Sequence, residues 1–197
     1  RGELGVHFSG IGISIIFTAL LVEYLLSVPF NWQHQWLAFA MMALVLSIPA
    51  WLWMPHPELN HPRVNAKVLK DNPPGKKYTL LLLASYFCAG YGYVVSATFI
   101  VDIIEGKPAL QGLGQWVFIL IGIAATPAVL VWDKIARKLG YLKSLFLAYS
   151  IQVIGIVLPT ISDHMVIIAL SALLFGGTFV ACVSLVLTMA GHFFPSN

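Results

Sequence analysis

The chain has 197 residues, of which 59% are hydrophobic and only 10% are charged, with a formal net charge of +3. Soluble domains usually carry about 25% charged residues, and a chain of this length has too little interior to bury so many apolar side chains, so a water-soluble fold is excluded. The basic residues lie in connections between apolar stretches rather than on one polar face, which argues against nucleic-acid binding. No metal-ligand spacing is present, and no cofactor is expected.

Six continuous apolar runs are long enough to cross a bilayer as helices. A hydrocarbon core of about 30 Å needs roughly 20 helical residues. The runs lack the alternation of a membrane barrel strand, and backbone groups in lipid must bond within their own segment. The sequence therefore predicts an all-α, polytopic bundle with spans at residues 6–28, 36–54, 78–104, 113–132, 144–161 and 165–189.

The first run carries one carboxylate, Glu23, among Leu, Val, Ala and Tyr residues. Such a group is costly in a membrane and usually faces a cavity or a partner. One interpretation is a proton or substrate-cation site, and the other is an interfacial glutamate near the outer boundary. The stripe that includes Gly10 and Ser14 predicts a helix-packing face, whereas Glu23 falls nearly opposite, together with Gly12 and Ala19.

Residues 55–77 are rich in Pro, Asn and Lys, separate two runs from four, and predict a cytoplasmic linker. Because Lys and Arg are retained on the cytoplasmic side, their distribution among the connections predicts the orientation. Ten of the eleven basic residues fall on one side when six spans alternate, and only Lys107 falls on the other. We therefore expect both termini on the cytoplasmic side of the membrane.

The third run contains CAGYGYVVSATFIVD, in which Gly90 and Gly92 flank Tyr91. Two glycines in mid-membrane permit either close packing or a local break, and transporters place binding sites at interrupted spans. In a regular helix, Tyr91, Thr98 and Asp102 project from one face. This face is interpreted as a polar pathway for a substrate or an ion. The alternative is that Tyr91 packs, Thr98 bonds its own backbone and Asp102 lies in the outer headgroup region.

Two later runs carry polar or small residues in mid-membrane. Gly176 and Gly177 precede Thr178, which shares a face with Cys182. Helix packing explains such glycine pairs. Gln152 in the fifth run is an amide that must find a partner, more often on a neighbouring helix than on a substrate.

The connection after the fourth run reads WDKIARKLGYLKS. Its residues Asp133, Lys134, Arg137 and Lys138 resemble the D-R-x-G-R-R/K core of the cytoplasmic loop motif of the major facilitator superfamily. That motif lies between the second and third helices of each six-helix half. The chain lacks both glycines of the motif. An acid at a helix end and basic residues in the loop can latch neighbouring helices through ion pairs.

Three phrases carry a closer resemblance over nearly the whole chain. They are GVHFSGIGISI (residues 5–15), YFCAGYGYVVSATFIV (residues 86–101) and ALLFGGTFVACVSL (residues 172–185), which are similar to the YbfB/YjiJ group of major facilitator transporters. The resemblance implies helices five to ten of a twelve-helix fold: residues 1–54 end the first half, residues 55–77 form the central linker, and residues 78–197 begin the second half. It also implies the bacterial cytoplasmic (inner) membrane, with the lipid bilayer and the remaining helices of the transporter as partners.

The same resemblance implies a function and a set of site residues. In the superfamily, the cavity between the halves is lined largely by the first, fourth, seventh and tenth helices. The last two of these correspond to residues 78–104 and 165–189, so Tyr91, Thr98, Asp102 and Thr178 are the cavity candidates. The implied function is secondary transport of a small solute by alternating access, with proton coupling through Glu23 or Asp102 as a hypothesis.

Two other functions remain as alternatives. The first is a non-transporting six-helix scaffold or assembly partner, held together by its glycine-rich faces. The second is an intramembrane enzyme, but the sequence contains no Ser-His-Asp, paired-Asp or HExxH pattern. His7 and Glu23 lie about 24 Å apart along one helix, too far to share a metal. We therefore expect no enzyme.

Overall fold

The computed structural model describes residues 2–29, 31–54 and 72–193. These residues contain six long α-helices and one 3-10 turn: α1 (Gly2–Leu26), α2 (Trp32–Trp53), α3 (Lys76–Glu105), η1 (Pro108–Leu110), α4 (Gly114–Leu139), α5 (Tyr141–Ile161) and α6 (Met165–Phe193). All six helices are long and apolar enough to cross a membrane, which confirms the prediction of an all-α protein with six spans. The expected linker lies outside the described residues from position 55 to position 71.

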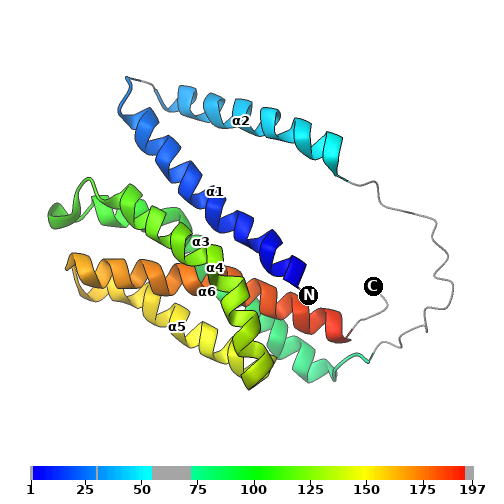
Figure 1. Ribbon diagram of the computed structural model, residues 1–197. Coiled ribbons are helices and arrows are strands. Elements are labelled where there is room, and N and C mark those ends of the chain that lie inside the picture. Colours follow the sequence, from blue (N-terminus) through cyan, green and yellow to red (C-terminus); the bar gives the residue numbers. More distant parts are fainter. Residues whose placement is uncertain (1, 30, 55–71, 194–197) are drawn as a thin grey trace. The chain divides into compact units, whose positions relative to one another are not determined.

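The chain divides into two compact units. One comprises Arg1–Leu20 together with Lys70–Asn197, and the other comprises Leu21–Leu69. The first unit contains α3, α4, α5 and α6 together with most of α1 (Figure 1). The second contains α2, in which no residue is buried.

Helix α6 lies at the centre of the first unit and packs against α4 on one side and α5 on the other. Close approach to α4 requires Gly176, because a Cβ atom there would lie 2.3 Å from the carbonyl oxygen of Ile121. The same two helices are joined by Trp132 of α4, whose indole N–H donates to the carbonyl of Gly177 on α6 at 2.8 Å. The buried residues form two clusters, and α4 and α6 contribute to both.

Helix α1 packs on α4 through the stripe opposite the predicted Gly10 and Ser14 face. Gly10 and Ser14 are exposed, whereas Gly12 and Ala19 are buried. A Cβ atom on Gly12 would lie 2.4 Å from the backbone nitrogen of Thr126, so the two helix backbones nearly touch. Both stripes of α1 contain small residues, and composition alone could not distinguish the one that meets a partner.

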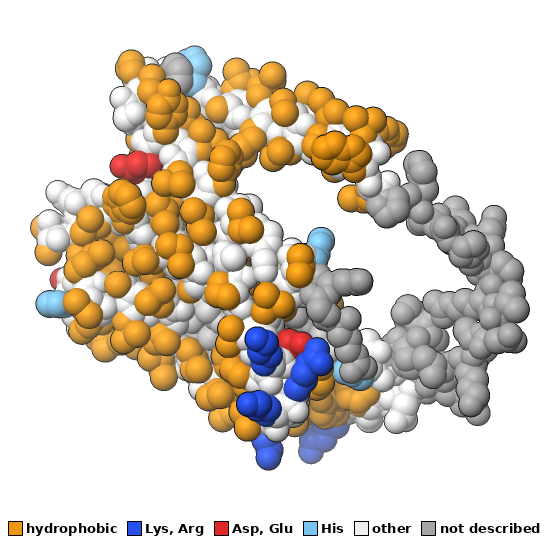
Figure 2. Space-filling model, viewed as in Figure 1, with side chains coloured by type: hydrophobic (Ala, Val, Ile, Leu, Met, Phe, Trp, Pro, Cys, Tyr) orange, Lys and Arg blue, Asp and Glu red, His pale blue; other side chains and the backbone are white. Residues whose placement is uncertain are grey.

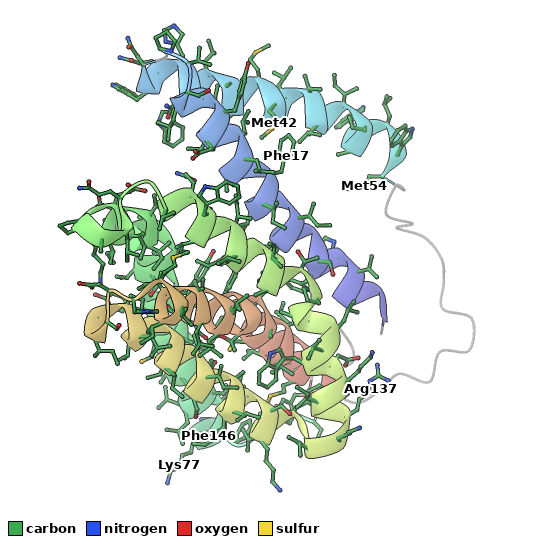
Figure 3. All side chains as sticks on the ribbon, turned by 60° about the vertical axis from the view of Figure 1, so that its left-hand side comes forward. Phe17, Met42, Met54, Lys77, Arg137 and Phe146 are labelled. Carbon is green, nitrogen blue, oxygen red and sulfur yellow. The ribbon has the colours of Figure 1, made fainter. Side chains whose placement is uncertain are left out.

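The charged residues divide between the two ends of the first unit. At one end, Figure 2 shows Lys and Arg side chains gathered together, and the labelled Lys77 and Arg137 both lie in the lower part of Figure 3. At the other end, the ammonium group of Lys107 donates to the carbonyl of Pro159 at 2.6 Å and pairs with Asp163. Lys107, the one basic residue predicted to lie on the non-cytoplasmic side, is therefore paired with Asp163 in the connection between α5 and α6.

Candidate functional site

Helix α3 presents the predicted polar face outward. It runs without a break from Lys76 to Glu105, so the two mid-membrane glycines do not interrupt it. The regular helix keeps Tyr91, Thr98 and Asp102 on one side. All three are exposed, and Tyr91 retains 70% of its accessible surface. Among the described residues of the first unit, none covers this face.

The remaining candidate on α6, Thr178, lies in the packed interior. Its side chain is only 2% exposed, and its hydroxyl donates to the carbonyls of Leu174 and Phe175 at 2.8 and 3.1 Å. The hydroxyl is thus bonded within its own helix, as is common for threonine in a helix interior. The structure does not bring Thr178 together with the exposed face of α3.

Glu23 belongs to the other compact unit, which begins at Leu21. Its side chain is exposed on α1, whereas Leu25, half a turn further along, is buried. Glu23 and the α3 residues are therefore parts of two different bodies.

A cavity of about 580 Å³ lies beside Tyr91, between α3, α5 and α6. Small-molecule sites usually enclose about 300–1,000 Å³, with mostly apolar walls and a few polar groups. Helix α3 contributes Tyr91 and Tyr93, α5 contributes Gln152, and α6 contributes Phe179 and Cys182. The cavity therefore joins one predicted residue to side chains from two other helices.

The buried amide of Gln152 has its partner on the neighbouring helix, as expected for a mid-membrane glutamine. Its Oε1 accepts a hydrogen bond from the thiol of Cys182 at 3.3 Å, and the residue is 3% exposed. A second contact joins the same two helices, because the hydroxyl of Ser171 donates to the carbonyl of Gly155 at 2.6 Å. These bonds hold α5 against α6 and set the position of the Gln152 side chain.

The residues that resemble the loop motif lie on a helix rather than in a loop. Helix α4 continues to Leu139, and the turn into α5 is made by Gly140 alone at φ 87°, a conformation that favours glycine. Asp133 Oδ2 accepts from Arg137 Nη2 at 2.6 Å, one helical turn away. The basic residues Lys134 and Lys138 are exposed beside this pair.

A smaller cavity, of about 270 Å³, lies at this end of α4. Asp133 lines it together with Tyr141 and His192, whose rings are 5.3 Å apart, and Gly5 of α1 forms part of its wall. The end of α4 thus meets both α1 and α6 at a polar site. In the described part of the chain, no group of three His, Cys, Asp or Glu side chains could hold a metal ion.

Comparison with known proteins places the chain in a family. Residues 3–197 match the family model MFS_4, described as "Uncharacterised MFS-type transporter YbfB". The chain belongs to this family of major facilitator transporters. No curated protein and no solved structure matches the chain. The resemblance to YbfB-like transporters is therefore confirmed.

Of the residues that line the cavity, the sequence singled out Tyr91 and Gln152. The pathway role of Tyr91 stays a prediction, whereas the expected partner of the Gln152 amide is found on α6. The stacked rings of Tyr93 and Phe179 were missed, although aromatic residues four apart on α6, Phe175 and Phe179, could have indicated an aromatic face. Thr98 and Asp102 do not line this cavity and lie further along α3.

Proposed function

We propose that the chain forms part of a secondary transporter that moves a small solute across the membrane by alternating access. Membership of the YbfB-like family supports transport in general. The observation that supports this more specific function is the unpacked face of α3, where Tyr91, Thr98 and Asp102 are exposed and where Tyr91 lines a cavity of about 580 Å³. Transporters place polar groups within a membrane span where the span borders a substrate or ion pathway.

We further propose the bacterial cytoplasmic membrane, with both termini on the cytoplasmic side. The gathering of Lys and Arg side chains at one end of the first unit supports this orientation (Figure 2). The bonded Lys107 at the opposite end supports it too, because its charge is compensated by Asp163.

Proton coupling is a separate part of the proposal. A carboxylate inside a membrane is stable when protonated or when paired, so its ionisation can be linked to solute binding. Asp102 lies on the pathway face of α3, and Glu23 lies within the α1 span. Either carboxylate can serve as the proton acceptor.

The test is solute flux in proteoliposomes containing the full-length protein and a pH-sensitive dye in the lumen. A panel of sugars, amino acids and aromatic solutes is added outside, and uptake and lumenal pH are recorded together. Flux driven by an imposed pH gradient should fall at least tenfold in Glu23→Gln or in Asp102→Asn. Asp163→Asn removes a carboxylate from the same end of the bundle as Asp102 and should leave the pH dependence unchanged.

Unchanged pH-driven flux in both variants would remove the coupling proposal. Absence of flux for every solute would contradict transport and favour the scaffold. The close contact of Gly12 with Thr126 favours such a role as well, because it binds α1 to α4 tightly.

A further inference from the structure

We infer that the cavity beside α3 binds an uncharged, planar aromatic solute, held by ring stacking and by the amide of Gln152. This inference rests on the proposed function, because it names the class of solute that the transporter would carry. Three features of the cavity support it: an aromatic wall, one carboxamide, and the absence of ionised side chains among the described residues that line it.

The first feature is a cluster of three nearly parallel rings, in which Tyr93 also lies 6.4 Å from Phe175. Tyr93 lies 5.0 Å from Phe179 with an interplanar angle of 9°, and Phe179 lies 5.5 Å from Phe175. Phe175 and Phe179 are buried, but Tyr93 keeps 37% of its surface exposed. Aromatic pairs prefer such offset parallel arrangements, so a flat ring entering the cavity can extend the stack.

The second feature is the amide of Gln152. A carboxamide has two N–H donors and a carbonyl with two lone pairs. The carbonyl accepts from Cys182, whereas no acceptor for the two N–H groups is found within residues 2–29, 31–54 and 72–193. Gln152 lines this cavity and a second one of about 320 Å³ between α3 and α5, so its donors can reach a ligand. The hydrogen bond from the Cys182 thiol restricts the orientation of this amide.

The third feature is charge. Among the described residues around the cavity, the polar groups are phenols, the carboxamide and a thiol, with no Asp, Glu, Lys, Arg or His. An ionised ligand would lose its hydration without gaining an opposite charge, which is strongly unfavourable. A neutral solute with one hydrogen-bond acceptor fits this lining.

Three probes of nearly equal size separate these features. Benzamide has a flat ring and a neutral carbonyl acceptor, benzoate adds a negative charge, and cyclohexanecarboxamide keeps the amide but loses the aromatic ring. Binding to the full-length protein in detergent is measured by saturation-transfer NMR and titration. Benzamide should bind most tightly. Cyclohexanecarboxamide should bind about three- to tenfold more weakly than benzamide, and benzoate at least about tenfold more weakly. Equal binding of all three would overturn the inference.

Two variants assign the binding to this cavity. Gln152→Leu keeps the volume of the side chain and removes its donors, so benzamide affinity should fall about three- to tenfold. Gly90→Ala adds a methyl group to the cavity wall where nothing lies within 4 Å, so it should weaken binding without disturbing the fold. Gly10→Ala is the matched control, because that helical glycine also has free space around it but lies on α1.

If Gln152→Leu does not fold, as judged by gel filtration, Gly90→Ala decides the matter. Benzamide binding unaffected by Gly90→Ala would overturn the site. The outcomes also separate this inference from the proposed function. Flux of some other solute without benzamide binding would overturn the inference and leave transport standing. Selective benzamide binding without flux of any solute would overturn transport and leave the binding site standing.

Discussion

Helices α3 and α6 are almost equal in length, and both are apolar enough to cross a membrane, yet they are used differently. In the most hydrophobic stretch of α6, 56% of the residues are buried inside the protein, compared with 6% in α3. Helix α6 has small residues such as Gly176 and Ser171 where its neighbours approach. Helix α3 carries large exposed side chains, including Phe87 and Tyr91. Hydropathy identifies a span, but it does not tell what the span faces.

This difference gives the two helices different roles. The packed α6 holds α4 and α5 in place and positions Gln152 through the thiol of Cys182. The open α3 contributes the residues that are free to meet solute, lipid or further helices. Substitutions matched between the two helices test this comparison.

The largest effect is expected from a leucine truncation in α6. Leu185 is 3% exposed, so Leu185→Ala should lower the free energy of unfolding by about 2–5 kcal/mol, through lost contacts and a cavity. Leu80 in α3 is 67% exposed, and Leu80→Ala should change the free energy of unfolding by less than about 0.5 kcal/mol. Unfolding by SDS in mixed micelles, followed by circular dichroism, measures both. Equal losses of unfolding free energy in the two variants would contradict the difference in packing between α6 and α3.

Two glycine substitutions, one on each helix, test the same difference in packing. Gly176→Ala should destabilise by about 1–3 kcal/mol, since its Cβ would meet the backbone of Ile121 at 2.3 Å and force α4 and α6 apart. Gly90→Ala should be neutral or stabilising by up to about 1 kcal/mol, because it meets nothing and removes a flexible residue from a helix. The same unfolding assay applies. A loss of stability in Gly90→Ala as large as in Gly176→Ala would show that α3 is packed after all.

The smallest effects concern the ion pairs at the two ends. Lys107 is 18% exposed and joins the segment after α3 to the end of α5, so Lys107→Gln should cost about 1 kcal/mol. The Arg137–Asp133 pair is exposed, and solvent and salt screen it, so Arg137→Gln should leave stability unchanged. Thermal unfolding at two salt concentrations separates the cases. A marked loss in Arg137→Gln would mean that this pair holds the fold together.

Much of this architecture could be predicted from the sequence because lipid imposes strict requirements on composition and length. The six helices, the shared face of Tyr91, Thr98 and Asp102, and the family were all accessible in this way. The helix ends were less predictable, since α4 continues past the apolar run into the motif residues as far as Leu139.

The rest depends on contacts between residues distant in the sequence. Thr178 was expected in a cavity, but the rotation of α6 against α4 and α5 turns it inward. The partner of Lys107 lies 56 positions away, at Asp163. The stack of Tyr93 on Phe179 exists only because α3 lies beside α6. Periodicity describes one helix at a time and carries no information on such pairs.

The two native cysteines provide the most direct test, because one lies on each helix. Cys88 on α3 is exposed and Cys182 on α6 is buried. Alkylation needs a thiolate and therefore water. Proteoliposomes treated with N-ethylmaleimide and analysed by peptide mass mapping should show Cys88 modified much faster than Cys182, whose thiol is buried and bonded to Gln152 Oε1. If Cys88 is as protected as Cys182, α3 does not border a water-accessible pathway, and the proposed transport route along it is contradicted.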